Sequence, residues 1–125
     1  MNERTLRLRP ANCCSEVIEP APLADDDQTR LIATFKALGD PTRMQIFRLI
    51  AAQSQPICAC DIVDRFAVSQ PTIAHHTRVL REAGLITSTK IGVWAYYQVD
   101  PAGVSLLGAI ADLLLDPPEV AAAVA

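Results

Sequence analysis

Long hydrophobic runs are missing from this 125-residue sequence. The longest apolar stretch lies near the C-terminus, where Asp112 interrupts it, and it is far shorter than the roughly 18 residues that a membrane-spanning helix needs. No apolar segment follows the first charged residues, as it would in a secretory signal. We therefore expect a cytoplasmic protein that does not associate with membranes.

Cysteine is scarce, and its distribution argues against a disulfide scaffold. The four cysteines form two local pairs, Cys13 with Cys14 and Cys58 with Cys60. A disulfide between such close neighbours would close almost no loop and would restrain little of the unfolded chain. Reduced thiols with a chemical task are the better interpretation, and the alternative is that these residues are small, inert hydrophobic side chains.

The usual signatures of a catalytic site are absent from the sequence as well. It has no Gly-rich phosphate loop, no HExxH motif and no nucleophile beside a base. The two histidines, His75 and His76, are neighbours that would point about 100° apart on a helix, so they cannot share one ion. We expect no enzymatic activity.

Half of the residues are hydrophobic, which is enough for one globular domain with a modest core. The first 22 residues contain three prolines and show neither a helical nor a strand period. The sequence therefore predicts a flexible arm at 1–22 that carries Cys13 and Cys14, a domain at 23–116, and a short tail at 117–125.

Apolar periodicity and capping residues predict five helices and one hairpin. Asp40 and Ser69 are expected N-caps, Pro41 occupies a first helical position, and Gly84 ends a helix. β-Branched and aromatic residues around Gly92 predict the hairpin. The helices are expected within 25–39, 40–53, 56–66, 69–84 and 102–116, and the hairpin within 86–99.

Two of the predicted helices carry informative apolar residues. In the first helix, Leu31, Ile32, Phe35 and Leu38 recur at helical spacing. The last helix is apolar on nearly every side, and such a helix must be covered, so we expect a second copy of the chain to cover it. Its large apolar residues are Val104, Leu106, Leu107, Ile110, Leu113, Leu114 and Leu115.

A short helix, a turn, a second helix and a hairpin follow one another in the order of a winged helix-turn-helix. The expected fold class is α+β and mainly α, with a two-stranded β-hairpin as the wing. The second helix of the pair has a polar, partly basic side that suits the major groove of double-stranded DNA, although an ordinary solvated helix face is the alternative. The candidate DNA-binding residues are Ser69, Gln70, Thr72, His75, Arg78 and Lys90.

The charge distribution agrees with this interpretation. Segment 65–98 contains four basic residues and only one acidic residue, Glu82, which gives it a local charge of +3. The rest of the chain therefore carries −6, because the net charge is −3. A basic module on an acidic body keeps the attraction to phosphates local.

Three motifs together resemble the ArsR/SmtB family of metal-responsive repressors. They read "FKALGDPTRMQIFRLI", "ICACD", and "VSQPTIAHHTRVLREAGLI" followed by "VWAYYQV", and they cover roughly residues 30–100 in the family's order and spacing. The resemblance implies a winged-helix homodimer, paired through its first and last helices, that binds operator DNA. It also implies release from the operator when a metal or metalloid binds.

The sequence departs from the family pattern at several positions. Thr77 stands where the recognition helix usually has leucine, and Ala74 where serine is common, so base preference does not carry over. The last helix has no histidine, which removes the family's final-helix zinc site. Val63 occupies the third position of a box that reads Cys-x-Cys-x-x-Cys in the arsenic-sensing version.

The "ICACD" motif keeps two cysteines, Cys58 and Cys60. Their side chains would point about 200° apart on a regular helix. They can converge only if Cys58 precedes the first helical turn, where exposed backbone amides would also favour thiolate over thiol. The arm can supply a third ligand, since the eleven residues from Cys14 to Asp25 span at most roughly 36–40 Å. The arm could therefore reach the third helix of its own subunit or that of a partner subunit.

The resulting hypothesis is a repressor that arsenite or antimonite releases from DNA through the thiolates of Cys13, Cys14, Cys58 and Cys60. A site with three thiolate ligands is easier to assemble than a site with four. This favours a metalloid that binds three ligands in a trigonal arrangement. One alternative is a sensor of cadmium, lead or zinc that uses all four thiolates. Another is a thiol redox regulator.

Overall fold

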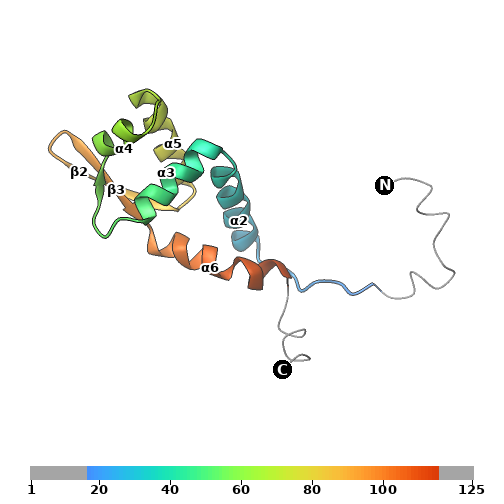
Figure 1. Ribbon diagram of the computed structural model, residues 1–125. Coiled ribbons are helices and arrows are strands. Elements are labelled where there is room, and N and C mark those ends of the chain that lie inside the picture. Colours follow the sequence, from blue (N-terminus) through green and yellow to red (C-terminus); the bar gives the residue numbers. More distant parts are fainter. Residues whose placement is uncertain (1–16, 116–125) are drawn as a thin grey trace, which may run out of the picture.

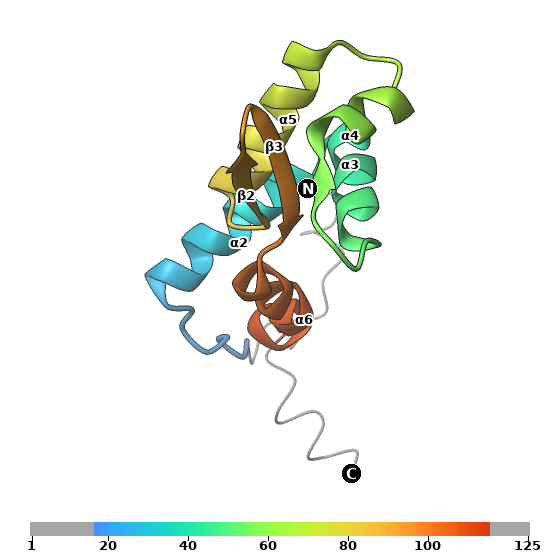
Figure 2. The ribbon, with the colours of Figure 1, turned by 90° about the vertical axis from the view of Figure 1, so that its left-hand side faces the viewer.

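The computed structural model describes residues 17–115 and contains a helical body with one small sheet (Figures 1 and 2). The β2–β3 hairpin projects from one side of the helices, and α6 lies beside the segment that precedes α2 (Figure 1). The helices are α2 (Asp25–Leu38), α3 (Pro41–Ala51), α4 (Ala59–Arg65), α5 (Gln70–Glu82) and α6 (Pro101–Leu115). The strands are β1 (Ile57–Cys58), β2 (Ile86–Ile91) and β3 (Trp94–Val99).

All five predicted helices and the hairpin are present, and helix-capping chemistry explains several of their ends. The Asp40 carboxylate accepts a hydrogen bond from the backbone N–H of Arg43 at 2.9 Å, and Ser69 caps α5 in the same way. At the other end of α5, Gly84 adopts a φ of 80° and donates to the Arg81 carbonyl. Leu85 donates to the Leu80 carbonyl, which completes a Schellman motif.

The sheet contains a third strand that the sequence did not predict. Its order is β1–β3–β2, and both pairings are antiparallel. In β1, Ile57 pairs with Tyr97 and Cys58 pairs with Tyr96. The predicted two-stranded hairpin is confirmed as β2 and β3, and β1 was missed because a two-residue strand is too short to show a period.

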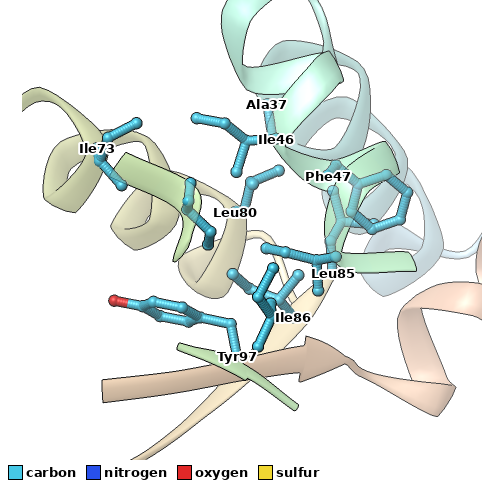
Figure 3. Close-up of a cluster of buried hydrophobic side chains, with 11 residues drawn as sticks. Ala37, Ile46, Phe47, Ile73, Leu80, Leu85, Ile86 and Tyr97 are labelled. Atoms are coloured by element: carbon cyan, nitrogen blue, oxygen red, sulfur yellow. The ribbon is translucent and has the colours of Figure 1, made fainter. Parts of the chain in front are cut away.

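One apolar core joins the helices to the sheet (Figure 3). Figure 3 shows Tyr97 at its edge, with the hydroxyl directed away from Leu85 and Ile86. The buried cluster consists of Ala37, Ile46, Phe47, Ile50, Ile57, Ile62, Ile73, Leu80, Leu85, Ile86 and Tyr97.

The apolar side chains of the first helix, α2, divide between the body of the subunit and solvent. Ile32 and Phe35 are 46% and 50% exposed, whereas Leu31, Thr34 and Ala37 are buried. Leu31 and the smaller Thr34 and Ala37 therefore face the body of this subunit, and two large apolar side chains face outward.

The last helix, α6, also leaves apolar side chains uncovered. Within Pro101–Leu115, only Gly103 and Leu106 are buried. The exposed large apolar residues of this helix are Val104, Leu114 and Leu115.

Gly103 lets α6 approach the backbone that follows α5. A Cβ atom added at Gly103 would contact the carbonyl oxygen of Gly84 and lie 2.9 Å from the Cα of Leu85. Both neighbours are backbone atoms, which cannot move aside as a flexible side chain could. The position therefore excludes any side chain larger than hydrogen.

We predict opposite effects for two glycine-to-alanine substitutions in α6. Gly103→Ala should lower the free energy of unfolding by about 1–3 kcal/mol, as overpacking does. Gly108→Ala is the matched control, because a Cβ there has no atom within 4 Å, and it should raise stability by roughly 0.5–1 kcal/mol. Urea unfolding of both variants at one protein concentration would check this, and equal effects would refute the close approach.

Candidate nucleic-acid interface and thiol site

Helices α4 and α5 and the turn between them present one polar side to solvent. Gln70, His75 and Arg78 on α5 are exposed, whereas Ile73, Thr77 and Leu80 on its other side are buried. This division agrees with the predicted inner and outer sides of the helix.

The predicted DNA-binding residues form two small groups on α5, and Lys90 stands apart on the hairpin. The hydroxyl oxygens of Ser69 and Thr72 are 3.0 Å apart at the start of α5, where Ser69 also accepts from the Thr72 N–H. One turn further on, a guanidinium nitrogen of Arg78 lies 3.3 Å from His75 Nδ1. Lys90 is exposed near the end of β2.

A cavity of about 340 Å³ brings α4, α5 and the hairpin together. Gln70 and Ala74 border it from α5, Cys60 from α4, and Lys90 and Trp94 from the hairpin. The structure therefore places two predicted DNA-binding residues and one predicted metal ligand around the same space.

A partly buried arginine–histidine contact fixes α5 against the body. Arg43 donates from Nε to the Ala37 carbonyl at 2.6 Å, and its guanidinium lies 3.2 Å from His76 Nδ1. Because arginine can only donate, His76 Nδ1 must accept and its proton must be on Nε2, which lies 4.0 Å from the Asp40 carboxylate. Burial lowers the pKa of His76, and the Asp40 carboxylate only partly opposes this.

The two thiols of the "ICACD" box converge. Cys58 is buried and extended, with a φ of −69° and a ψ of 143°, and it precedes the first turn of α4. Cys60 is exposed, and its Sγ lies 2.8 Å from that of Cys58. Cys58 thus precedes the first helical turn, which is the condition under which the two sulfurs can share one ligand.

At Cys60, a hydrogen bond between the two thiols opposes the effect that the sequence predicts for a helix N-terminus. The Cys60 thiol donates its proton to Cys58 Sγ, and this hydrogen bond is the main reason that the pKa of Cys60 is raised above its usual value of 9.0. Loss of the proton would remove the hydrogen bond. A ligand that binds both sulfurs must therefore displace this proton.

A buried pair of hydroxyls links the sheet to α5, and sequence reasoning missed it. The Thr77 hydroxyl bonds to the Ile73 carbonyl at 3.0 Å and lies 3.3 Å from the Tyr97 hydroxyl. Tyr97 is the β3 residue that pairs with Ile57, next to Cys58. The only signal in the sequence was a threonine at a position where the family usually has leucine.

The other two predicted ligands, Cys13 and Cys14, lie outside the described residues. Within residues 17–115, no group of three or more Cys, His, Asp or Glu side chains is arranged to hold a metal ion. The described part of the site thus provides two sulfur ligands.

Comparison with known proteins decides the family. The sequence profile described as "Bacterial regulatory protein, arsR family" matches residues 40–88. A putative arsenical resistance operon repressor of Halobacterium salinarum is 31% identical over 101 residues, which cover 81% of this chain and 82% of the relative. The chain belongs to the arsR family. The arsenical resistance operon repressor of Escherichia coli is 39% identical over 70 residues, which cover 56% of this chain and 59% of that protein.

Solved structures of arsR-family regulators have the same fold. An ArsR-like transcriptional regulator from Rhodococcus sp. RHA1 superposes with a TM-score of 0.65 at 24% identity, covering 79% of this chain and 92% of that one. A homodimeric winged helix-turn-helix domain from Mycobacterium bovis gives a TM-score of 0.57 at 22% identity, covering 78% of this chain and 91% of that chain. The fold is a winged helix-turn-helix with α5 as its second helix and β2–β3 as its wing.

Membership of the arsR family makes the chain a DNA-binding transcriptional regulator and not an enzyme. Between residues 17 and 115, no helix is long and apolar enough to cross a membrane. The chain spans only 52–65% of the length of several arsenical repressors that it matches.

We predict that His76 makes the stability of this arsR-family protein depend on pH. Its lowered pKa means that the unfolded state binds a proton more readily, so stability should be full above about pH 6.5 and fall as the pH drops below that value. His76→Gln should remove this loss between about pH 8 and pH 5. Urea unfolding across that range measures it. The exposed neighbour variant His75→Gln is the control, and it should keep most of the wild-type pH dependence because His75 contributes least to lowering the pKa of His76. The same pH dependence in His76→Gln and the wild type would assign the effect to another group.

Proposed function

We propose that this protein is a cytoplasmic, homodimeric repressor that arsenite or antimonite releases from its operator. In this proposal the ion binds the thiolates of Cys58 and Cys60 together with at least one of Cys13 and Cys14. The observation that carries the proposal is the convergence of the Cys58 and Cys60 sulfurs at the start of the helix-turn-helix. Thiolates select soft ions over magnesium, calcium or manganese, and a reducing cytoplasm keeps them available.

The DNA-binding side of the proposal rests on exposure and chemistry. Gln70, His75 and Arg78 project from α5 and have the donors and acceptors that read base edges in the major groove. Ser69 and Thr72 lie at the N-terminus of α5, where backbone amides and hydroxyls suit a phosphate. Lys90 is exposed on the wing, and in this proposal it contacts the DNA backbone.

The proposed dimer is supported by the apolar side chains that α2 and α6 leave exposed. They are Ile32, Phe35, Val104, Leu114 and Leu115. A second copy would bury them, and the related domain from Mycobacterium bovis is a homodimer. Two copies would present two α5 helices to two half-sites.

The structure offers a short physical route from the thiols to the DNA-reading helix. Cys58 pairs with Tyr96 in β3, and the next residue, Tyr97, reaches Thr77 in the middle of α5. An ion that draws the two sulfurs together with an arm cysteine would change the position of β1 and α4. We propose that β3 passes this change to α5 and favours a form that fits the operator less well.

The experiment is operator release by arsenite, measured by fluorescence anisotropy on DNA that the purified protein selects from random sequences. Arsenite should weaken wild-type binding by roughly 5- to 150-fold, the usual range of coupling between sites. Cys58→Ser and Cys60→Ser should each lose this response while keeping their affinity for the operator. A double Cys13→Ser/Cys14→Ser variant should also lose most of it.

These three variants separate the parts of the proposal. An unchanged response in both Cys58→Ser and Cys60→Ser would remove the thiol pair from the sensing site. An unchanged response in the double arm variant would show that the arm supplies no ligand. Single Cys13→Ser and Cys14→Ser variants then tell which arm thiol is needed.

A further inference from the structure

The tip of the wing carries three large apolar side chains that face solvent. Ile91, Val93 and Trp94 are 60%, 82% and 53% exposed. Ile91 pairs with Trp94 where β2 and β3 end, and Gly92 and Val93 form the two-residue turn between them. Single exposed apolar residues are common on proteins, whereas a group of them marks an interaction site.

The geometry of the hairpin does not account for this group. A two-residue hairpin turn needs a positive φ at its first central position, and Gly92 supplies it with a φ of 65°. The apolar side chains of Ile91, Val93 and Trp94 are not needed for that conformation, and turns are usually rich in polar residues. The apolar character of the tip therefore points to a partner that covers it.

The position of the tip identifies this partner as duplex DNA. Val93 and Trp94 border the same cavity as Gln70 of α5, and Figure 2 shows the hairpin alongside that helix. When α5 lies in the major groove, a hairpin beside it lies over the flanking backbone and minor groove. Lys90 directly precedes the tip, and the local charge of +3 in segment 65–98 favours a polyanion over a purely apolar partner.

We propose that Ile91 and Val93 form an apolar wedge that enters the minor groove beside each α5 half-site and kinks the operator there. Apolar side chains that insert between base steps in the minor groove partly unstack them and bend the duplex by about 20–90°. Kinking is easiest at the flexible pyrimidine–purine steps TA and CA/TG, so the wing selects operators that contain such a step. The inference rests on the DNA-binding part of the proposed function.

The first measurement is the shape of the operator in its complex with the full-length wild-type protein, without arsenite. Duplexes that the protein selects from random sequences carry a donor and an acceptor dye at their ends, and 2-aminopurine replaces one adenine at a time. Energy transfer should rise as for a bend of about 20–90°, and 2-aminopurine fluorescence should rise at an unstacked step. A straight duplex without an unstacked step would overturn the proposal.

Two substitutions of Val93 distinguish a wedge from a contact with phosphates. Val93→Thr keeps the branched shape but adds a hydroxyl group, so it should weaken operator binding roughly 10-fold and abolish the 2-aminopurine signal. Val93→Lys should abolish the signal as well, although its added charge would strengthen a contact made only to phosphates. Retention of the signal by both variants would rule out the wedge.

Val17→Thr is the matched control for these variants. Val17 is 75% exposed and belongs to the segment before α2, which lies far from the wing (Figure 1). This variant should bind and bend the operator as the wild type does. Urea unfolding should give the same stability for Val93→Thr and the wild type, because the changed side chain is exposed.

The DNA sequence provides a second test. Replacement of the responsive pyrimidine–purine step by the stiffer step AA should weaken wild-type binding roughly 10-fold. The loss for Val93→Thr should be much smaller, because this variant no longer kinks the duplex. Equal losses for the two proteins would assign the sequence preference to other residues and contradict the wedge.

Arsenite enters none of these measurements, so the two proposals can fail separately. If arsenite failed to release the wild type from an operator that it kinks, the proposed inducer would be wrong and the wedge would stand. If arsenite released the wild type from a straight operator, the wedge would be wrong and the thiol site would stand.

Discussion

The pairing of β1 with β3 is the interaction on which the geometry of the site depends. It consists of two residue pairs, Ile57 with Tyr97 and Cys58 with Tyr96. This pairing keeps Cys58 in an extended conformation, and the extended conformation turns its sulfur toward Cys60. Without it, α4 would start earlier and the two thiols would diverge around the helix. The convergence of the Cys58 and Cys60 sulfur atoms thus depends on a strand of two residues.

Strand β3 connects the thiols to the surface that we propose binds DNA. β3 lies between β1 and β2, so it belongs to the wing and also contacts the segment that carries the thiols. Its residue Tyr97 is buried and meets Thr77 on α5 through their hydroxyl groups. Helix α5 is held on another side by Arg43, through His76. In the proposed mechanism, a change at the thiols would reach a helix whose position is fixed by a few identifiable contacts.

Local chemistry made much of the fold predictable from the sequence. Asp40, Ser69 and Gly84 act through their own backbone neighbours, so their roles as helix ends could be inferred without tertiary structure. Helical periodicity was enough to separate the outer side of α5, with Gln70 and His75, from its buried side.

Features that depend on contacts between distant segments were not predictable in this way. Strand β1 exists only because β3 pairs with it, and the contact between Thr77 and Tyr97 joins residues twenty positions apart. The raised pKa of Cys60 follows from the position of one sulfur atom, which outweighs the general effect of a helix N-terminus. The outward direction of Phe35 reflects which side of α2 the body occupies.

The central claim is that the thiol site and the operator site are coupled through this small sheet. Thermodynamic linkage requires such coupling to be reciprocal. The most direct measurement is the affinity of the wild-type protein for arsenite, determined by competition with a chelating dithiol, first alone and then with saturating operator DNA. The account predicts that the operator weakens arsenite binding by the same factor by which arsenite weakens operator binding. Equal arsenite affinities with and without DNA would contradict it.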